Sequence, residues 1–128
     1  MKAGIAVVVA LVGTLASCAA MAATNDGNAL LTSCKPILSL INKEATKIIG
    51  SEAEAGECLG LTEGVRNTMM QLNSSLQPEM RTCFPDLGIQ NGQAIRIVVK
   101  YLESHPEKLN QDRTLLTMLA YNQAYACK

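Results

Sequence analysis

The sequence is poor in aromatic residues and has one histidine. Phenylalanine, tryptophan and tyrosine make up 3% of its 128 residues, with no tryptophan, and the eleven basic side chains are balanced by eleven acidic ones. Nucleic-acid-binding domains carry a clustered basic face and use aromatic rings to stack on bases. The scarcity of both features argues against DNA or RNA as a partner.

The single histidine, His105, stands before Pro106 at the end of an apolar run, VVKYLESHPEKL. Nucleophile-and-base catalysis needs a base that lies close to the nucleophile, and nothing in the sequence supplies that pair. A histidine near a helix C-terminus donates to the last free carbonyls, and a following proline stops the helix. We therefore expect His105 to end a helix and the protein not to be an enzyme.

The N-terminus has the features of an export signal. Lys2 precedes an apolar run over residues 4–14, GIAVVVALVGT, which is shorter than the roughly 20 residues of a membrane-spanning helix. Small residues at Ala20 and Ala22 predict a signal peptide over residues 1–22 and a single helical domain over residues 23–128. In an alternative interpretation, LASC at residues 15–18 is a lipobox and a lipid on Cys18 holds the protein at a membrane. Both interpretations place the protein outside the cytoplasm.

Four cysteines follow the signal: Cys34, Cys58, Cys83 and Cys127. An even number in a small exported domain predicts a disulfide framework. The alternative is a zinc site, but the separations of 24, 25 and 44 residues contain no C-x-x-C pair and no partnering histidine. We expect two disulfides and neither a metal nor a cofactor.

Four segments have apolar residues at helical spacing, and none shows the alternation of a strand. The expected fold is all-α, a bundle of four or five helices braced by two disulfides. The first helix should begin after residues 26–28, and the others should span about 57–72, 90–104 and 107–126. Pro36 predicts either a bend in the first helix or a start near Lys35. The last helix should bury Leu109, Leu115, Leu116, Leu119 and Ala120.

Two further expectations concern the second helix. The acidic stretch 50–56, GSEAEAG, resembles a solvated loop, and Gly60 and Gly64 indicate either close approach of a neighbouring backbone or an irregular helix start.

If the first two helices are antiparallel, Cys34 and Cys83 lie at the same end of the bundle. This placement favours the pairs Cys34–Cys83 and Cys58–Cys127.

Several stretches together resemble the Rap/Tai family of type VI secretion immunity proteins. They are DGNALLTSC at 26–34, CLGLTEGV at 58–65, Cys83-x-Pro85, GQAIRIVVKYLESHPEKL at 92–109 and AYAC at 124–127. The resemblance implies a periplasmic, mostly helical homodimer that binds a peptidoglycan amidase injected by sister cells and blocks its groove. Thr62 departs from the family, which usually has a large apolar residue at this position.

The same resemblance suggests which residues contact the amidase. They follow the third helix: Glu103, Ser104, His105, Glu107 and Lys108. An alternative function is that of a small periplasmic holdase acting under acid stress, because disulfide-braced helical chaperones have a related layout.

Overall fold

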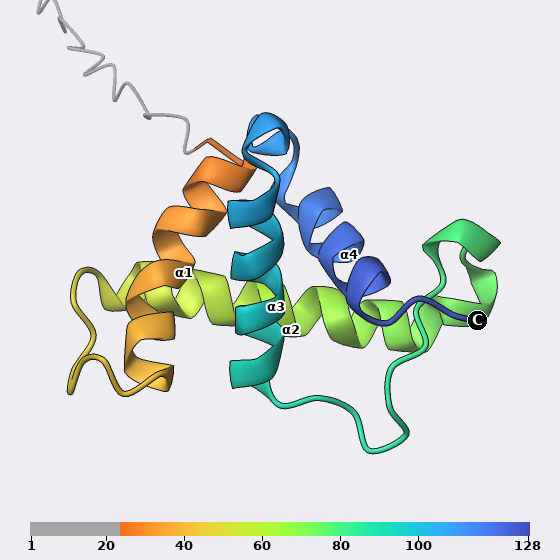
Figure 1. Cartoon of the computed structure of the whole chain (residues 1–128), viewed down its shortest axis with the longest axis horizontal. Coiled ribbons are helices and arrows are strands. Elements are labelled where there is room, and N and C mark those ends of the chain that lie inside the picture. Colours follow the sequence, from red (N-terminus) through yellow and green to blue (C-terminus); the bar gives the residue numbers. More distant parts are fainter. Residues whose placement is uncertain (1–23) are drawn as a thin grey trace, which may run out of the picture.

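The computed structural model describes residues 24–128, which fold into four α-helices. They are α1 (Gly27–Ile41), α2 (Glu52–Leu72), α3 (Asn91–Ser104) and α4 (Arg113–Ala124), with three short 3₁₀ turns, η1 (Asn73–Ser75), η2 (Pro78–Met80) and η3 (Pro106–Lys108) (Figure 1). This part of the chain has no strand, only two isolated β-bridges. The all-α prediction is confirmed. The predicted signal peptide, its cleavage after Ala22 and the proposed lipid site at Cys18 lie outside the described residues.

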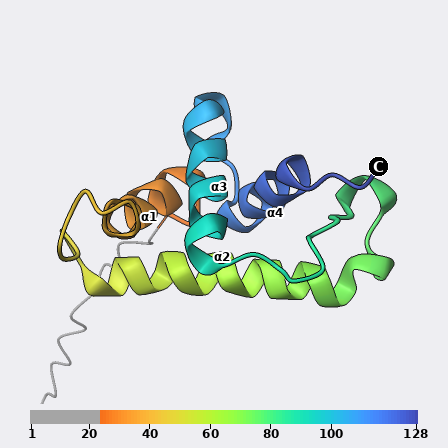
Figure 2. The ribbon, with the colours of Figure 1, turned by 60° about the horizontal axis from the view of Figure 1, so that its bottom comes forward.

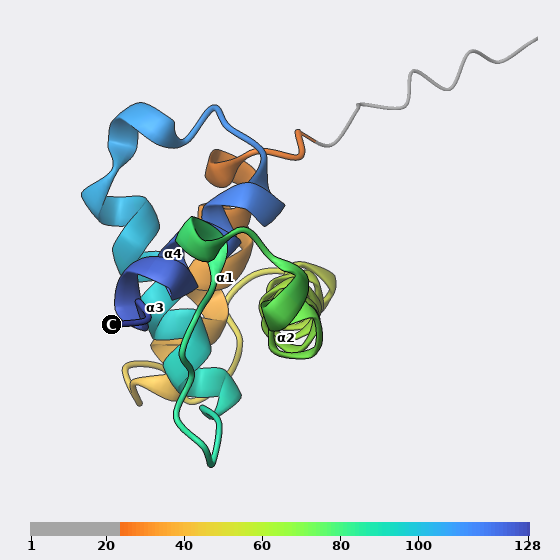
Figure 3. The same cartoon turned by 90° about the vertical axis from the view of Figure 1, so that its right-hand side faces the viewer.

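Helix α2 forms the base on which the other three helices pack. Figures 2 and 3 show α1, α3 and α4 on one side of it. Helix α3 lies between α1 and α4 in Figure 1 and contacts α1, α2 and α4. The core is built from side chains of all four helices: Leu30, Cys34, Cys58, Val65, Met69, Ala94, Ile95, Val98, Val99, Tyr101, Leu102, Leu116, Ala120 and Tyr121. None of the helices in residues 24–128 is long and apolar enough to cross a membrane.

Side-chain caps decide where α1 and α2 begin. The carboxylate of Asp26 accepts from the amide of Ala29 at 3.0 Å, and the hydroxyl of Ser51 accepts from the amide of Glu54 at 3.4 Å. The expectation of a loop over residues 50–56 was therefore wrong, since α2 begins at Glu52. Acidic side chains in a first helical turn complement the helix dipole, which makes Glu52 and Glu54 favourable there.

The fourth helix begins later than predicted. Residues 106–108 form the separate turn η3, and α4 starts only at Arg113. The Asp112 carboxylate sets this start by accepting from the amides of Thr114 and Leu115 at 2.9 and 3.0 Å. Leu116 and Ala120 are buried as expected, whereas Leu115 is an exposed side chain and its predicted burial was wrong.

Helix α1 runs through Pro36 and begins at Gly27, which excludes a start near Lys35. At Gly27, a neighbouring segment does approach the helix backbone closely. A Cβ placed there would lie 2.5 Å from Cδ1 of Leu116 and 3.1 Å from the Cα of Leu109. Gly60 and Gly64 behave differently, because a Cβ on either would meet nothing within 4 Å. The predicted backbone approach at these two positions was wrong, and so was an irregular start, since both lie inside a regular helix.

The two disulfides are present, but their pairing differs from the prediction. Cys34 is joined to Cys58, and Cys83 to Cys127. Cys34 lies seven residues before the end of α1 and Cys58 six residues after the start of α2. Residues at similar distances from a connecting segment meet when the chain turns back on itself, so this bridge follows from the true start of α2.

Backbone hydrogen bonds tie both ends of the described chain to distant segments. The amide of Gly27 donates to the carbonyl of Gln111 at 3.1 Å, and that of Arg113 to the carbonyl of Asn25 at 3.0 Å. At the other end, the amide of Cys83 donates to the carbonyl of Tyr125 at 2.8 Å. The N-terminal segment therefore lies beside the start of α4, and the C-terminal tail beside the segment that follows η2.

Candidate functional site

The residues predicted to contact a partner lie at the C-terminal end of α3. We name this set the α3 C-terminal surface: Glu103, Ser104, His105, Glu107 and Lys108. Glu103, Ser104 and Glu107 are exposed, while His105 and Lys108 are partly buried. The surface therefore presents side chains of both charges to solvent.

His105 ends α3, as the sequence predicts. Its Nδ1 lies 2.8 Å from the backbone carbonyl oxygen of Tyr101, and its ring stacks on the Tyr101 ring with centroids 4.2 Å apart. Because a carbonyl oxygen only accepts, Nδ1 carries the proton in this geometry. Its contacts are those of a residue that ends a helix.

The charged side chains around His105 form weak surface contacts. The Lys108 ammonium lies 5.7 Å from the centroid of the Tyr101 ring and 3.3 Å from its hydroxyl. Glu103 lies 4.0 Å from Lys35, and both side chains are more than half exposed. Exposed pairs of this kind contribute little to stability, so these charges are available to a partner.

The opposite end of α3 carries a feature that the sequence reasoning missed. Residues 85–88 form a tight turn, in which the amide of Gly88 donates to the carbonyl of Pro85 at 2.7 Å and Gly88 has a φ of +70°. The segment extends away from the helices in Figures 1 and 3. The side chain of Leu87 at its tip is fully exposed. The signal was a large apolar residue placed between turn formers in PDLG.

This Leu87 turn (residues 85–88) is anchored on both sides. Before it, the ring of Phe84 packs against Tyr121 and Tyr125, with centroids 5.6 and 5.5 Å apart. After it, the buried guanidinium of Arg66 in α2 donates from Nη1 to the carbonyl of Ile89 at 2.9 Å. A turn held at both ends loses less conformational entropy when it binds a partner.

Tyr121, against which the ring of Phe84 packs, belongs to the hydrophobic core. The hydroxyl of Tyr121 donates to the carbonyl of Thr62 at 2.7 Å, and burial raises the pKa of Tyr121 well above its usual value, offset in part by the positive charge of Arg66. The Thr62 hydroxyl donates to the carbonyl of Cys58 at 2.8 Å. Thr62 therefore fits a buried position because its own helix satisfies its hydroxyl.

An apolar groove of about 370 Å³ lies between α2 and α4, and Gly60 and Gly64 leave its floor open. Its other lining residues are Leu61, Val65, Thr68, Met69, Leu72, Leu76, Thr114 and Met118. Leu72 is half exposed at this face. An open apolar groove of this size is suited to receive an apolar helix or turn.

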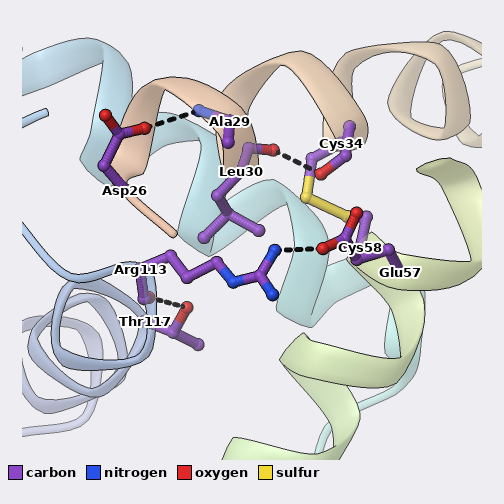
Figure 4. A network of polar contacts seen from close by, with 9 residues as sticks. Asp26, Ala29, Leu30, Cys34, Glu57, Cys58, Arg113 and Thr117 are labelled. Atoms are coloured by element: carbon purple, nitrogen blue, oxygen red, sulfur yellow. Dashed lines mark hydrogen bonds and ion pairs between the residues drawn. A yellow bond between two sulfur atoms is a disulfide. The ribbon is translucent and has the colours of Figure 1, made fainter. Parts of the chain in front are cut away.

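A polar link between α4 and α2 lies close to the Cys34–Cys58 disulfide (Figure 4). The guanidinium of Arg113 is paired with the carboxylate of Glu57, next to Cys58. The Thr117 hydroxyl donates to the Arg113 carbonyl at 2.8 Å. Each polar group in this network has a partner, which is typical of a structural contact. No cluster of three metal-ligating side chains occurs in residues 24–128.

Comparison with known proteins gives one match. The model of the Rap1a immunity proteins matches residues 26–127, which is the described chain almost from end to end. No curated protein and no solved structure matches the sequence. Because the match covers far more than half of the sequence, the chain belongs to the family of Rap1a immunity proteins.

Proposed function

We propose that this protein is a periplasmic immunity protein that binds and neutralises a peptidoglycan amidase effector of a type VI secretion system. The observation that carries the proposal is the family match over residues 26–127. The two disulfides support a periplasmic site, because disulfides persist in oxidising compartments. Such a protein acts by occluding the enzyme and needs no catalytic residue of its own.

The Leu87 turn is the proposed anchor of the complex. A projecting turn is convex, so it fits the concave active-site groove of an amidase. The exposed Leu87 side chain gains free energy when it leaves water, and buried apolar anchors contribute more to binding than charged rims do.

The α3 C-terminal surface is proposed as a second contact, at the other end of the same helix (Figure 1). Its charged residues, Glu103, Glu107 and Lys108, are suited to steering the encounter with the effector. Charged rims of this kind act mainly on the association rate and on its salt dependence.

Expression in the periplasm of an amidase that is encoded next to this protein tests the function. Cells that co-express this protein should survive, and the two proteins should co-purify. Leu87→Asp should weaken the complex at least tenfold, because it places a charge where an apolar side chain is buried. The control is Ile49→Asp, which changes an exposed side chain on a different loop. Failure to protect against, and to bind, every neighbouring amidase would sink the proposal.

The two contacts are separable by rate measurements. Glu103→Ala and Lys108→Ala should change the association rate and its salt dependence, and leave the dissociation rate nearly constant. Leu87→Asp should instead raise the dissociation rate. If the α3 C-terminal substitutions alone abolish binding, the α3 C-terminal surface is the anchor and the role assigned to Leu87 is wrong.

We also propose a homodimer, in which two copies pack through the groove between α2 and α4. The open glycines leave room for a helix of a second copy to approach α2 closely. Light scattering on the purified protein should give twice the monomer mass, and Gly64→Gln should return it to the monomer. Gly56→Gln is the matched control, since Gly56 is equally open but does not line the groove. A monomeric wild-type protein would reject the dimer.

A small periplasmic holdase is the alternative function. A holdase suppresses aggregation of unrelated proteins at low pH and has no specific partner. Aggregation assays at acidic pH, run beside the amidase rescue, separate the two functions.

A further inference from the structure

The two disulfides lie in different environments. The side chains of Cys34 and Cys58 are completely buried, and Figure 4 shows their bridge between α1 and α2 in close-up. Cys83 and Cys127 are both exposed. Thiol–disulfide exchange requires a thiolate to reach a sulfur atom, so accessibility separates the two bridges. The outer bridge, Cys83–Cys127, is open to attack in the folded protein. The inner bridge, Cys34–Cys58, is reached only when the helices separate.

The outer bridge joins the C-terminal tail to the segment that follows η2. Cys127 is the second-to-last residue, and the tail after α4 is held by the 2.8 Å hydrogen bond from the Cys83 amide to the Tyr125 carbonyl. Ala126 also forms an isolated β-bridge with Thr82, and Tyr125 makes two further contacts. Its hydroxyl accepts from Nε2 of Gln93 at 2.8 Å, and its ring touches Phe84. Hydrogen bonds at the surface add little free energy once the covalent link is gone.

The outer bridge also lies two residues before the Leu87 turn. Of the two anchors of that turn, Phe84 follows Cys83 directly and packs partly on Tyr125 of the tail. The second anchor, the hydrogen bond from Arg66 to Ile89, lies beyond the turn and does not involve the tail. Opening the outer bridge therefore loosens one side of the turn and leaves the other side attached.

We infer that Cys83–Cys127 is a redox latch, which a dithiol reductant opens while Cys34–Cys58 and the four helices stay intact. One thiolate of the dithiol attacks a sulfur of the bridge, forms a mixed disulfide and releases the other cysteine as a thiolate, which takes up a proton. The second thiol of the dithiol then displaces the remaining cysteine. Two electrons and two protons pass to Cys83 and Cys127, and the dithiol becomes a disulfide.

The inference rests on the proposed function for its biological meaning. With the latch closed, the Leu87 turn is held in position for the effector. With the latch open, the turn must be ordered again on binding, so affinity falls. Immunity is thereby tied to an oxidising periplasm.

The test needs no effector. The exported, oxidised protein is incubated with increasing dithiothreitol, free thiols are alkylated, and the modified cysteines are located by mass spectrometry, while circular dichroism follows helix content. Cys83 and Cys127 should be alkylated at least tenfold faster than Cys34 and Cys58, with unchanged helicity. Equal rates for both bridges, or loss of helix together with the first bridge, would overturn the latch.

Hydrogen exchange supplies the second readout. In the reduced protein, amides of residues 82–88 and 125–128 should exchange at least tenfold faster, while those of α1 and α2 keep their protection. The double variant Cys83→Ser with Cys127→Ser should reproduce this pattern without reductant, and Cys34→Ser with Cys58→Ser should not. Unchanged exchange in residues 82–88 would show that the bridge does not control the turn.

A final measurement compares effector binding by the oxidised protein and by the Cys83→Ser, Cys127→Ser variant. Weaker binding by the variant supports the latch, and equal binding rejects its effect on immunity. Loss of the proposed function is a different outcome, since both forms would then fail to bind while the selective reduction persists.

Discussion

The hydroxyl of Tyr121 in α4 donates a 2.7 Å hydrogen bond to the backbone carbonyl of Thr62 in α2. This bond joins the base of the fold to its last helix at a point where both residues are completely buried. Replacing Tyr121 by phenylalanine keeps the ring and leaves the Thr62 carbonyl with only its helical partner. The contact therefore offers a way to measure how firmly α4 is attached to α2.

The raised pKa of Tyr121 predicts a pH-dependent stability. Above pH about 10 the unfolded chain loses the phenol proton that the folded state keeps, so stability falls as pH rises. Tyr121→Phe should cost about 1 kcal/mol at neutral pH. Above pH about 10, the free energy of unfolding of the wild type falls by about 1.4 kcal/mol per pH unit, and the variant lacks this loss because it has no phenol at this position. The two stability curves should therefore cross near pH 11. Urea unfolding at a series of pH values measures the crossing, and parallel curves would contradict it.

A pair of glycine substitutions should have opposite signs. Gly27→Ala forces a methyl group against Leu116 and the backbone of Leu109, and should cost about 1–3 kcal/mol. Gly56→Ala introduces no contact inside α2 and should stabilise the fold by about 1 kcal/mol through helix propensity. Thermal or urea unfolding of both variants measures the difference. A destabilised Gly56→Ala would show that helix propensity does not decide the effect at this open position.

The sequence predicted the third helix and the end of the second helix well but missed the start of the second by five residues, for reasons that particular residues make clear. Residues 91–104 have a strong apolar stripe and a proline just beyond the end, and α3 lies there. The start of α2 is instead decided by one hydroxyl, that of Ser51, which accepts from the amide of Glu54. The acidic, glycine-containing composition of this stretch concealed the cap.

The error in α2 explains the error in the disulfides. With a start near residue 57, Cys58 would lie in the first turn of α2, beside the connecting segment and far from the middle of α1. With the observed start at Glu52, Cys58 faces Cys34 across the turn of the chain. The predicted pairing was wrong because five helical residues, 52–56, were left out of α2. The Leu87 turn could not be found in this way, because exposure depends on the tertiary packing around it.

His105→Ala should leave the fold intact. The variant loses one partly buried helix-end hydrogen bond and a ring stacked on Tyr101, which together amount to about 1 kcal/mol. Its far-ultraviolet spectrum should match that of the wild type, and its melting temperature should fall by only a few degrees. A variant that fails to fold would show that the ring does more than end α3.

Arg66→Met tests the other anchor of the Leu87 turn. The guanidinium is buried and pairs with no carboxylate in residues 24–128, so its removal eliminates a desolvated charge as well as the bond to Ile89. The two effects oppose each other, and global stability should change by only about 1 kcal/mol.

Local exchange should respond more strongly than global stability in Arg66→Met. Amides of residues 86–90 should exchange faster, whereas those of α1 should not change. Arg96→Met is the control, because Arg96 is an exposed arginine that bonds Asn42 and the Ile41 carbonyl instead. Equal exchange in both variants would remove Arg66 from the support of the turn.

The pairing of residues 25–28 with residues 109–113 sets the order in which the fold is completed. These hydrogen bonds join the first described residues to residues more than 80 positions later. A chain that emerges from its N-terminus cannot close them until Arg113 has been synthesised, and the outer bridge waits for Cys127. The nascent protein therefore stays incompletely folded until α4 has been made.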